Sequence, residues 1–118
     1  MSLVCLPKHA KLLKASDYNQ VFDKAVRSSD RYFTVLARPN NLQRARLGMA
    51  FTKKRVKLAV ARNRLKRISR ESFRLTQDKF SADYVILAGT QCLKATNQQL
   101  FHSLEQHWQQ LYKKCAKF

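Results

Sequence analysis

The chain has 118 residues, 45% of them hydrophobic, and its 24 Lys and Arg residues against 7 Asp and Glu residues give a formal net charge of +17. This length and apolar content predict a single globular domain over residues 1–118, with fraying expected only in tails at about residues 1–12 and 113–118, and they exclude a disordered polycation. The net charge predicts a polyanionic partner, and nucleic acid is the leading candidate because its phosphates relieve such a positive potential.

An anionic membrane surface is a less favoured partner, because the apolar runs of the chain are only a few residues long whereas a span needs about 20. The N-terminus lacks the apolar core and cleavage site of a secretory signal, so we expect a cytoplasmic protein. Cys5, Cys92 and Cys115 lack the paired spacing of a zinc or redox motif. We therefore expect reduced thiols, no bound metal and no cofactor held by the protein alone.

The first predicted helix follows Ser16, an N-cap residue, and covers the run DYNQVFDKA. Four of its residues share one side by three-and-four spacing: Tyr18, Val21, Phe22 and Ala25. The next run, Tyr32 to Arg38, is rich in β-branched and aromatic residues and precedes a Pro-Asn-Asn turn. It predicts a strand that ends in a loop.

The segment Arg46 to Thr52 alternates in side-chain size and predicts a second strand. One face carries the large residues Leu47, Met49 and Phe51. The other carries the small residues Gly48, Ala50 and Thr52. Two interpretations of this bare face stay open: another element packs closely on it, or it forms the floor of a groove.

A basic loop, Lys53 to Lys57, leads into a long predicted helix at roughly Leu58 to Gln77. An apolar arc of this helix is expected to face the sheet: Leu58, Ala61, Leu65, Ile68, Ser72 and Leu75. Cations cover the other side, and Glu71 is the single acid there, whereas a solvated face normally carries Glu partners at i±4. The helix therefore predicts nucleic-acid binding. RNA is favoured over DNA because a strand and a loop, not a short helix, precede it.

The last two predicted elements are a strand and a helix. Asp83 to Ala88 is apolar on both faces, which predicts an interior strand. Thr96 and Gln99 have the spacing of a capping box, and an apolar stripe follows: Leu100, Leu104, Trp108 and Leu111. Together the elements predict an α+β fold with helices laid against a small sheet.

The run RLGMAFTKKRVKLAVARNRLKRISRESFR, with Arg62-Asn63-Arg64 followed by Lys66-Arg67, resembles the protein subunit of bacterial ribonuclease P. The SDYNQVF helix, the DRYFTVLAR strand, the DYVI strand and the amphipathic last helix occur in that family's order, so the resemblance covers nearly the whole chain. It implies a single-domain α/β sandwich with a small mixed sheet, three helices and a left-handed βαβ crossover. Pattern alone would not predict that handedness, because right-handed crossovers dominate.

The resemblance also implies a function: the protein assists a catalytic RNA that removes the leader from precursor transfer RNA, and it lowers the magnesium requirement of the holoenzyme. The residues implied to bind the RNA subunit are Arg62, Asn63, Arg64, Lys66, Arg67 and Arg70. The residues implied to hold the single-stranded leader, in a groove between the first helix and the sheet, are Tyr18, Phe22, Leu36, Ala50, Thr52 and Lys53. The implied partners are the RNA subunit and precursor transfer RNA, without a required protein partner.

No catalytic residue is expected in the chain itself, because its 7 acids and 3 His residues are scattered and form no acid–base pair or metal cluster. A free-standing nuclease is disfavoured for the same reason. The main alternative is a structural RNA-binding module, such as a small ribosomal protein, which the composition fits equally well.

Overall fold

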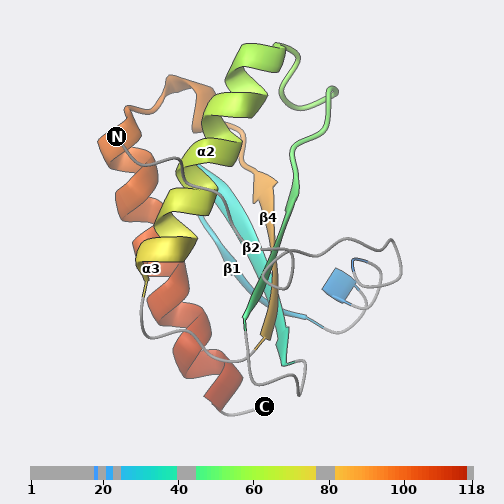
Figure 1. Ribbon diagram of the computed structural model, residues 1–118, viewed down its shortest axis with the longest axis vertical. Helices are drawn as coiled ribbons and strands as arrows, with labels where there is room; N and C mark the ends of the chain where they lie inside the picture. The colour runs from blue at the N-terminus through green and yellow to red at the C-terminus, as the bar shows by residue number, and fades with distance from the viewer. Residues whose placement is uncertain (1–17, 19–20, 23–24, 40–44, 77–81, 117–118) are drawn as a thin grey trace.

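The computed structural model describes residues 18, 21–22, 25–39, 45–76 and 82–116 and has the predicted α+β architecture (Figure 1). Its elements in chain order are β1 (Val26–Ser29), β2 (Phe33–Pro39), β3 (Arg46–Ala50), α2 (Ala59–Leu75), β4 (Ala82–Ala88), the 3-10 turn η2 (Cys92–Lys94) and α3 (Asn97–Ala116). Of the three predicted helices, the described residues contain α2, α3 and part of the first, in which Tyr18, Val21 and Phe22 have helical backbone.

The sheet has four strands in the order β1-β2-β4-β3. β2 pairs antiparallel with β1 and with β4, and β3 pairs parallel with β4. Since α2 connects β3 to β4, these three elements form the βαβ crossover unit that the resemblance implied. β4 is an interior strand, as its apolar sequence predicted, and all its residues except the half-buried Leu87 are buried.

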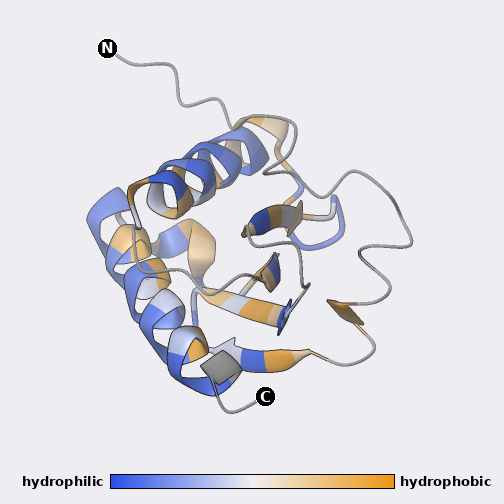
Figure 2. Ribbon diagram, turned by 60° about the horizontal axis from the view of Figure 1, so that its bottom comes forward, coloured by the Kyte–Doolittle hydropathy of each residue, from blue (hydrophilic) through white to orange (hydrophobic). Residues whose placement is uncertain are grey.

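The helices α2 and α3 lie on one side of the sheet, with their hydrophilic residues outward (Figure 1, Figure 2). Three rings join the layers: Tyr84 of β4 lies 5.9 Å from Phe73 of α2 and 5.5 Å from Trp108 of α3, measured between centroids. The Trp108 indole N–H also donates to the Ser72 hydroxyl at 2.9 Å. The predicted apolar stripe of α3 is confirmed, because Leu100, Leu104, Trp108 and Leu111 are all buried.

The predicted capping box of α3 is also confirmed. The Thr96 N–H donates to Gln99 Oε1 at 2.9 Å, and the Gln99 N–H donates to Thr96 Oγ1 at 3.2 Å. These two bonds satisfy N–H groups that have no partner within the helix. They place the beginning of α3 at Asn97, where the sequence predicted it.

The apolar arc predicted for α2 is wrong at both ends. Leu58 is 71% exposed and Leu75 is 59% exposed, whereas Ser69 and Phe73 are buried in their place. Leu58 has extended backbone and precedes the first turn, so it does not follow the helical spacing. Since α2 packs on α3 as well as on the sheet, its buried face turns toward α3.

Two short elements, β1 and η2, were not predicted. β1 has the sequence VRSS, which carries a weak strand signal because it is short and polar. Tertiary contacts stabilise it: Val26 packs against the main core and Ser28 is buried against α3. A turn joins β1 to β2, and in it Asp30 Oδ1 accepts the N–H groups of Tyr32 and Phe33 at 2.8 and 2.9 Å.

Gly89, directly after β4, lies against the turn between β1 and β2, and its N–H donates to the Tyr32 carbonyl at 2.8 Å. A Cβ at this position would lie 2.6 Å from the Arg31 carbonyl oxygen. Because that atom belongs to the backbone, no rotation of a side chain relieves the overlap. We expect Gly89→Ala to lower the free energy of unfolding by about 2 kcal/mol, measured by urea denaturation.

Gly48→Ala is the matched control, since the atoms that its Cβ would approach belong to the Tyr18 side chain. It should cost less than Gly89→Ala. An equal or larger loss at Gly48 would contradict the assigned packing of Gly89.

His107 of α3 is buried between the helix and the β1–β2 turn. Its Nδ1 lies 2.6 Å from Ser28 Oγ, and its Nε2 lies 3.3 Å from Asp30 Oδ2. Burial lowers the pKa of His107 below its ordinary value of 6.5, although Asp30 partly counteracts this effect. Burial raises the pKa of Asp30, but hydrogen bonds from the Ser103 hydroxyl and two backbone N–H groups outweigh it and leave that pKa below 3.8.

The lowered pKa of His107 predicts a loss of stability in mild acid. The unfolded chain binds a proton at this site below pH 6.5, whereas the folded chain resists it, so the free energy of unfolding should decline as pH falls from 6.5 through the lowered pKa. His107→Gln should flatten this decline in urea titrations at several pH values. His102→Gln, at an exposed position of α3, should retain it; an equal decline in both variants would contradict the assignment.

Candidate nucleic-acid interface

The six residues predicted to bind an RNA subunit all lie on α2. Asn63 and Arg67 are exposed, and the other four, Arg62, Arg64, Lys66 and Arg70, are half-buried. None of them belongs to the buried side of the helix, which consists of Leu65, Ile68, Ser69, Ser72 and Phe73. The structure therefore places all six on one helix and outside its buried side, whereas RNA binding by these residues stays a prediction.

Two of these arginines also bind the protein itself, which the sequence did not indicate. Arg62 Nη1 donates to the carbonyls of Val56 and Lys57 at 2.8 and 2.9 Å. Arg64 donates from Nε to Asn97 Oδ1 and from Nη2 to the Ala95 carbonyl, both at 2.8 Å. A guanidinium has five N–H donors, so each arginine keeps further donors for a phosphate.

The loop between β3 and α2 is closed by hydrogen bonds at both ends. At its beginning, the Thr52 carbonyl accepts the N–H groups of Arg55 and Val56 at 3.2 and 2.9 Å. The Val56 side chain is fully buried, while residues 52–55 are exposed. The loop thus presents its basic side chains, Lys53, Lys54 and Arg55, to solvent from a fixed backbone.

The face of the sheet opposite α2 and α3 carries a second, smaller apolar cluster. Its buried members are Val21, Leu36 and Val85, and Tyr18, Ala25, Ala50 and Leu87 pack against it. Strand register explains the grouping, because Leu36 and Gly48 both lie opposite Val85 of β4. The first helix and three strands therefore contribute to one surface, which we call the open face of the sheet.

The bare face of β3 is closely packed at one end, as the first of the two interpretations from the sequence predicted, while its use as the floor of a groove stays a prediction. At Gly48 the contact is close, since an added Cβ would lie 2.7 Å from Tyr18 Cε1. Beyond it, Ala50 is half-buried and Thr52 is exposed. Close packing by Tyr18 thus covers one end of the bare face, and the other end remains accessible.

The structure brings three of the six predicted leader-binding residues into one cluster: Tyr18, Leu36 and Ala50. Leu36 is only 6% exposed, so it can form the floor of a groove but offers little surface for stacking. Phe22, at 48% exposure, presents its ring to solvent, and Thr52 and Lys53 are exposed in the loop after β3. Sequence reasoning missed Val85 and Leu87, because their place on this face depends on register.

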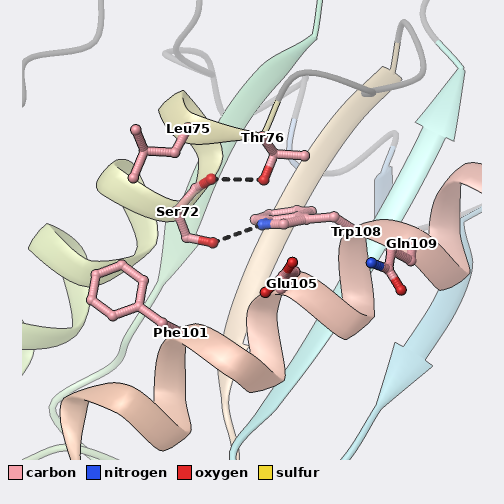
Figure 3. Close-up of a pocket in the computed structure, with 7 residues that line it drawn as sticks. All are labelled: Ser72, Leu75, Thr76, Phe101, Glu105, Trp108 and Gln109. Carbon is pink, nitrogen blue, oxygen red and sulfur yellow. Dashed lines mark hydrogen bonds between the residues drawn. The ribbon is translucent and has the colours of Figure 1, made fainter.

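A hollow between α3 and the C-terminal end of α2 is a separate feature (Figure 3). It is lined by Ser72, Leu75, Thr76, Phe101, Glu105, Trp108 and Gln109. These described lining residues include no Lys or Arg, so the hollow lacks the charge that a phosphate site requires. Its nearest residue on α2, Ser72, lies about 15 Å along the helix axis from Arg62, at a rise of about 1.5 Å per residue.

In the described part of the chain, no three His, Cys, Asp or Glu residues come together as a candidate metal site. Among the helices that the structure describes, none combines the length and the apolar character needed to cross a membrane.

Comparisons with known proteins agree with one another. A family model described as Ribonuclease P matches residues 6–112. A ribonuclease P protein component from Methylococcus capsulatus is 43% identical and covers 93% of this chain and 87% of its own. The corresponding protein from Vibrio cholerae is 41% identical and covers 94% of this chain and 95% of its own. One solved structure of the Staphylococcus aureus RNase P protein has a TM-score of 0.77 at 28% identity, covering 83% of this chain and 91% of that one.

The contact between Tyr18 and Gly48 can be tested in the isolated protein. A Cβ at residue 48 would displace the Tyr18 ring from the open face, so we expect Gly48→Ala to increase the nitration of Tyr18 by tetranitromethane. Peptide mass spectrometry would measure this, with the buried Tyr84 as the internal control. Equal nitration of Tyr18 in both proteins would show that its ring does not rest on Gly48.

Proposed function

The chain belongs to the ribonuclease P protein family and is the protein component of a ribonucleoprotein endoribonuclease that processes transfer RNA. From this premise we propose which RNA each of its two surfaces binds. In this proposal α2 binds the catalytic RNA subunit, and the open face of the sheet holds the single-stranded leader of precursor transfer RNA. The supporting observation is that one closed loop, residues 52–57, joins the basic helix to that face.

The proposed contact with the RNA subunit rests on charge held in a fixed arrangement. Along α2 six cations accompany the single acid Glu71, and the four basic residues of the preceding loop add to the same region. Guanidinium groups match phosphates through paired hydrogen bonds, and a rigid helix reduces the ordering cost of binding. The exposed Asn63 supplies a neutral donor and acceptor for a sugar or base edge.

The proposed contact with the leader rests on the chemistry of the open face. Its floor is aliphatic, formed by Leu36, Ala50 and Leu87. The Phe22 ring offers a stacking surface, while Lys53 can bind a phosphate. Stacking and apolar contact accept every base, so such a surface would bind leaders of varied sequence.

Catalysis is assigned to the RNA subunit in this proposal. Two of the acids already have partners in the fold: Asp83 accepts both bonds of a bidentate pair with Arg46 at 2.7 Å, and Asp30 accepts from Ser103 at 2.6 Å. Magnesium is assigned in this proposal to the phosphates of the RNA. The protein would lower the magnesium requirement of the holoenzyme by screening the repulsion between RNA phosphates. We further propose that it acts in the bacterial cytoplasm and that it requires no other protein partner.

Cleavage of a precursor transfer RNA by bacterial ribonuclease P RNA at low magnesium tests the proposal. We expect this protein to raise kcat/KM by about tenfold or more, which needs only ~1.4 kcal/mol of added interaction. A comparably basic small ribosomal protein is the control and should give a smaller effect.

Each unfavourable outcome has a distinct meaning. Equal stimulation by both proteins would reduce the role of α2 to that of a generic polycation. Absence of stimulation would favour a structural RNA-binding module. Cleavage by the bare protein, retained through repurification, would contradict the assignment of catalysis to RNA.

A further inference from the structure

Arg62 connects the two proposed RNA-binding surfaces, and we infer that it is a positioning residue: it fixes the Thr52–Lys57 loop and, through that loop, one end of the leader groove. This inference rests on the proposed function and assigns to Arg62 a task other than phosphate contact. Arg62 belongs to α2, which packs on one face of the sheet, and the inference gives it an effect on the other face, the open face.

The guanidinium of Arg62 binds the chain that leads into α2. Leu58, the residue before α2, makes no side-chain hydrogen bond to the helix. The backbone N–H of Arg62 makes the ordinary first helical bond, to the Leu58 carbonyl at 3.1 Å, and its guanidinium donates in addition to the carbonyls of Val56 and Lys57. One side chain therefore holds the two peptide units that lead into the helix.

Val56 relays this restraint to the groove. Its carbonyl accepts from Arg62, its N–H donates to the Thr52 carbonyl, and its side chain is fully buried. Thr52 is two residues beyond Ala50, the last residue of β3, so it continues the bare face of that strand. The chain of bonds thus runs from α2 to the groove end through a single residue.

Charge makes this restraint necessary. The loop carries Lys53, Lys54, Arg55 and Lys57, and Arg62 is a fifth cation beside them. Like charges at this spacing repel one another and favour an open loop, in which Thr52 and Lys53 would move away from Ala50. Charge-assisted bonds to backbone carbonyls are stronger than neutral ones and oppose that opening.

Arg67 provides the matched control. It lies on the same helix and carries the same charge, but it is exposed. Replacing it removes a cation from the surface proposed to bind the RNA subunit without removing a bond to the loop. The variants Arg62→Gln and Arg67→Gln therefore differ in the positioning effect while sharing the loss of one charge.

The first measurement is amide hydrogen exchange, monitored by NMR in the isolated protein without RNA. We expect Arg62→Gln to speed exchange of the Arg55 and Val56 amides by about tenfold, because the variant loses the charge-assisted hydrogen bonds that hold the loop closed. Amides in the middle of α2 should keep their protection. Arg67→Gln should leave the loop amides unchanged.

The second measurement compares, in the holoenzyme with saturating protein, the affinities for a precursor with a long leader and for one with a single-nucleotide leader. Arg62→Gln should reduce the ratio of these affinities by about fivefold, a typical lower value for coupling between two sites. Arg67→Gln should lower the affinity for the RNA subunit and its salt dependence but retain the ratio.

If Arg62→Gln proves too unstable, Arg62→Lys, which keeps the charge on a shorter stem without the planar fork, should show the same two effects in weaker form. Unchanged loop exchange, or an unchanged ratio in the Arg62 variants, would overturn the inference alone. A native protein without any preference for the long leader would instead contradict the proposed function.

Discussion

Strand β4 has to be buried on both faces at once, and this constraint organises the rest of the molecule. Ala82, Tyr84 and Ile86 face the core beneath α2 and α3, whereas Val85 and Leu87 belong to the cluster on the open face. The pairing of β4 with both β2 and β3 places it between them. A strand with alternating polar residues could not support two apolar layers, so the doubly apolar sequence of β4 is what allows a helical layer on one face of the small sheet and an apolar cluster on the other.

The distribution of acids is the second general feature. Asp83 and Asp30 serve the fold, one as the bidentate partner of Arg46 and the other within the turn between β1 and β2. The region from Lys53 to Arg74 contains Glu71 alone among acids. The Lys and Arg side chains of this region repel one another, and a polyanion that binds there reduces this repulsion. Binding and stability are therefore linked through the same charges.

Much of this fold could be predicted from the sequence, because the strongest signals are local. The capping box of α3, its apolar stripe and the interior strand β4 depend on residue type and spacing within one element. The ends of the buried face of α2 could not be predicted in this way, since packing against α3 shifts them toward Phe73. β1 escaped prediction because its burial comes from contacts with a helix almost 80 positions later, such as the bond between Ser28 and His107.

The candidate site likewise has some features that follow from local sequence or from the resemblance and others that depend on tertiary contacts. The cationic side of α2 follows from helical spacing, and Tyr18, Leu36 and Ala50 were placed by resemblance to a family. The contact of Tyr18 with Gly48 requires tertiary structure, as do the bonds from Arg62 to the loop and from Arg64 to the start of α3. A hydrogen bond from a side chain to a backbone carbonyl leaves no periodic pattern in the sequence. From the sequence, Arg62 and Arg64 were therefore expected only to contact RNA.

The position of Trp108 gives the molecule a built-in optical reporter. It is the single Trp of the chain, it is buried where α2, β4 and α3 meet, and its indole N–H is bound to Ser72 of α2. Indole emission responds to loss of a hydrogen-bond partner and to entry of water. Any shift of the basic helix relative to α3, on folding or on contact with RNA, would therefore change an intrinsic fluorescence signal without the introduction of a label.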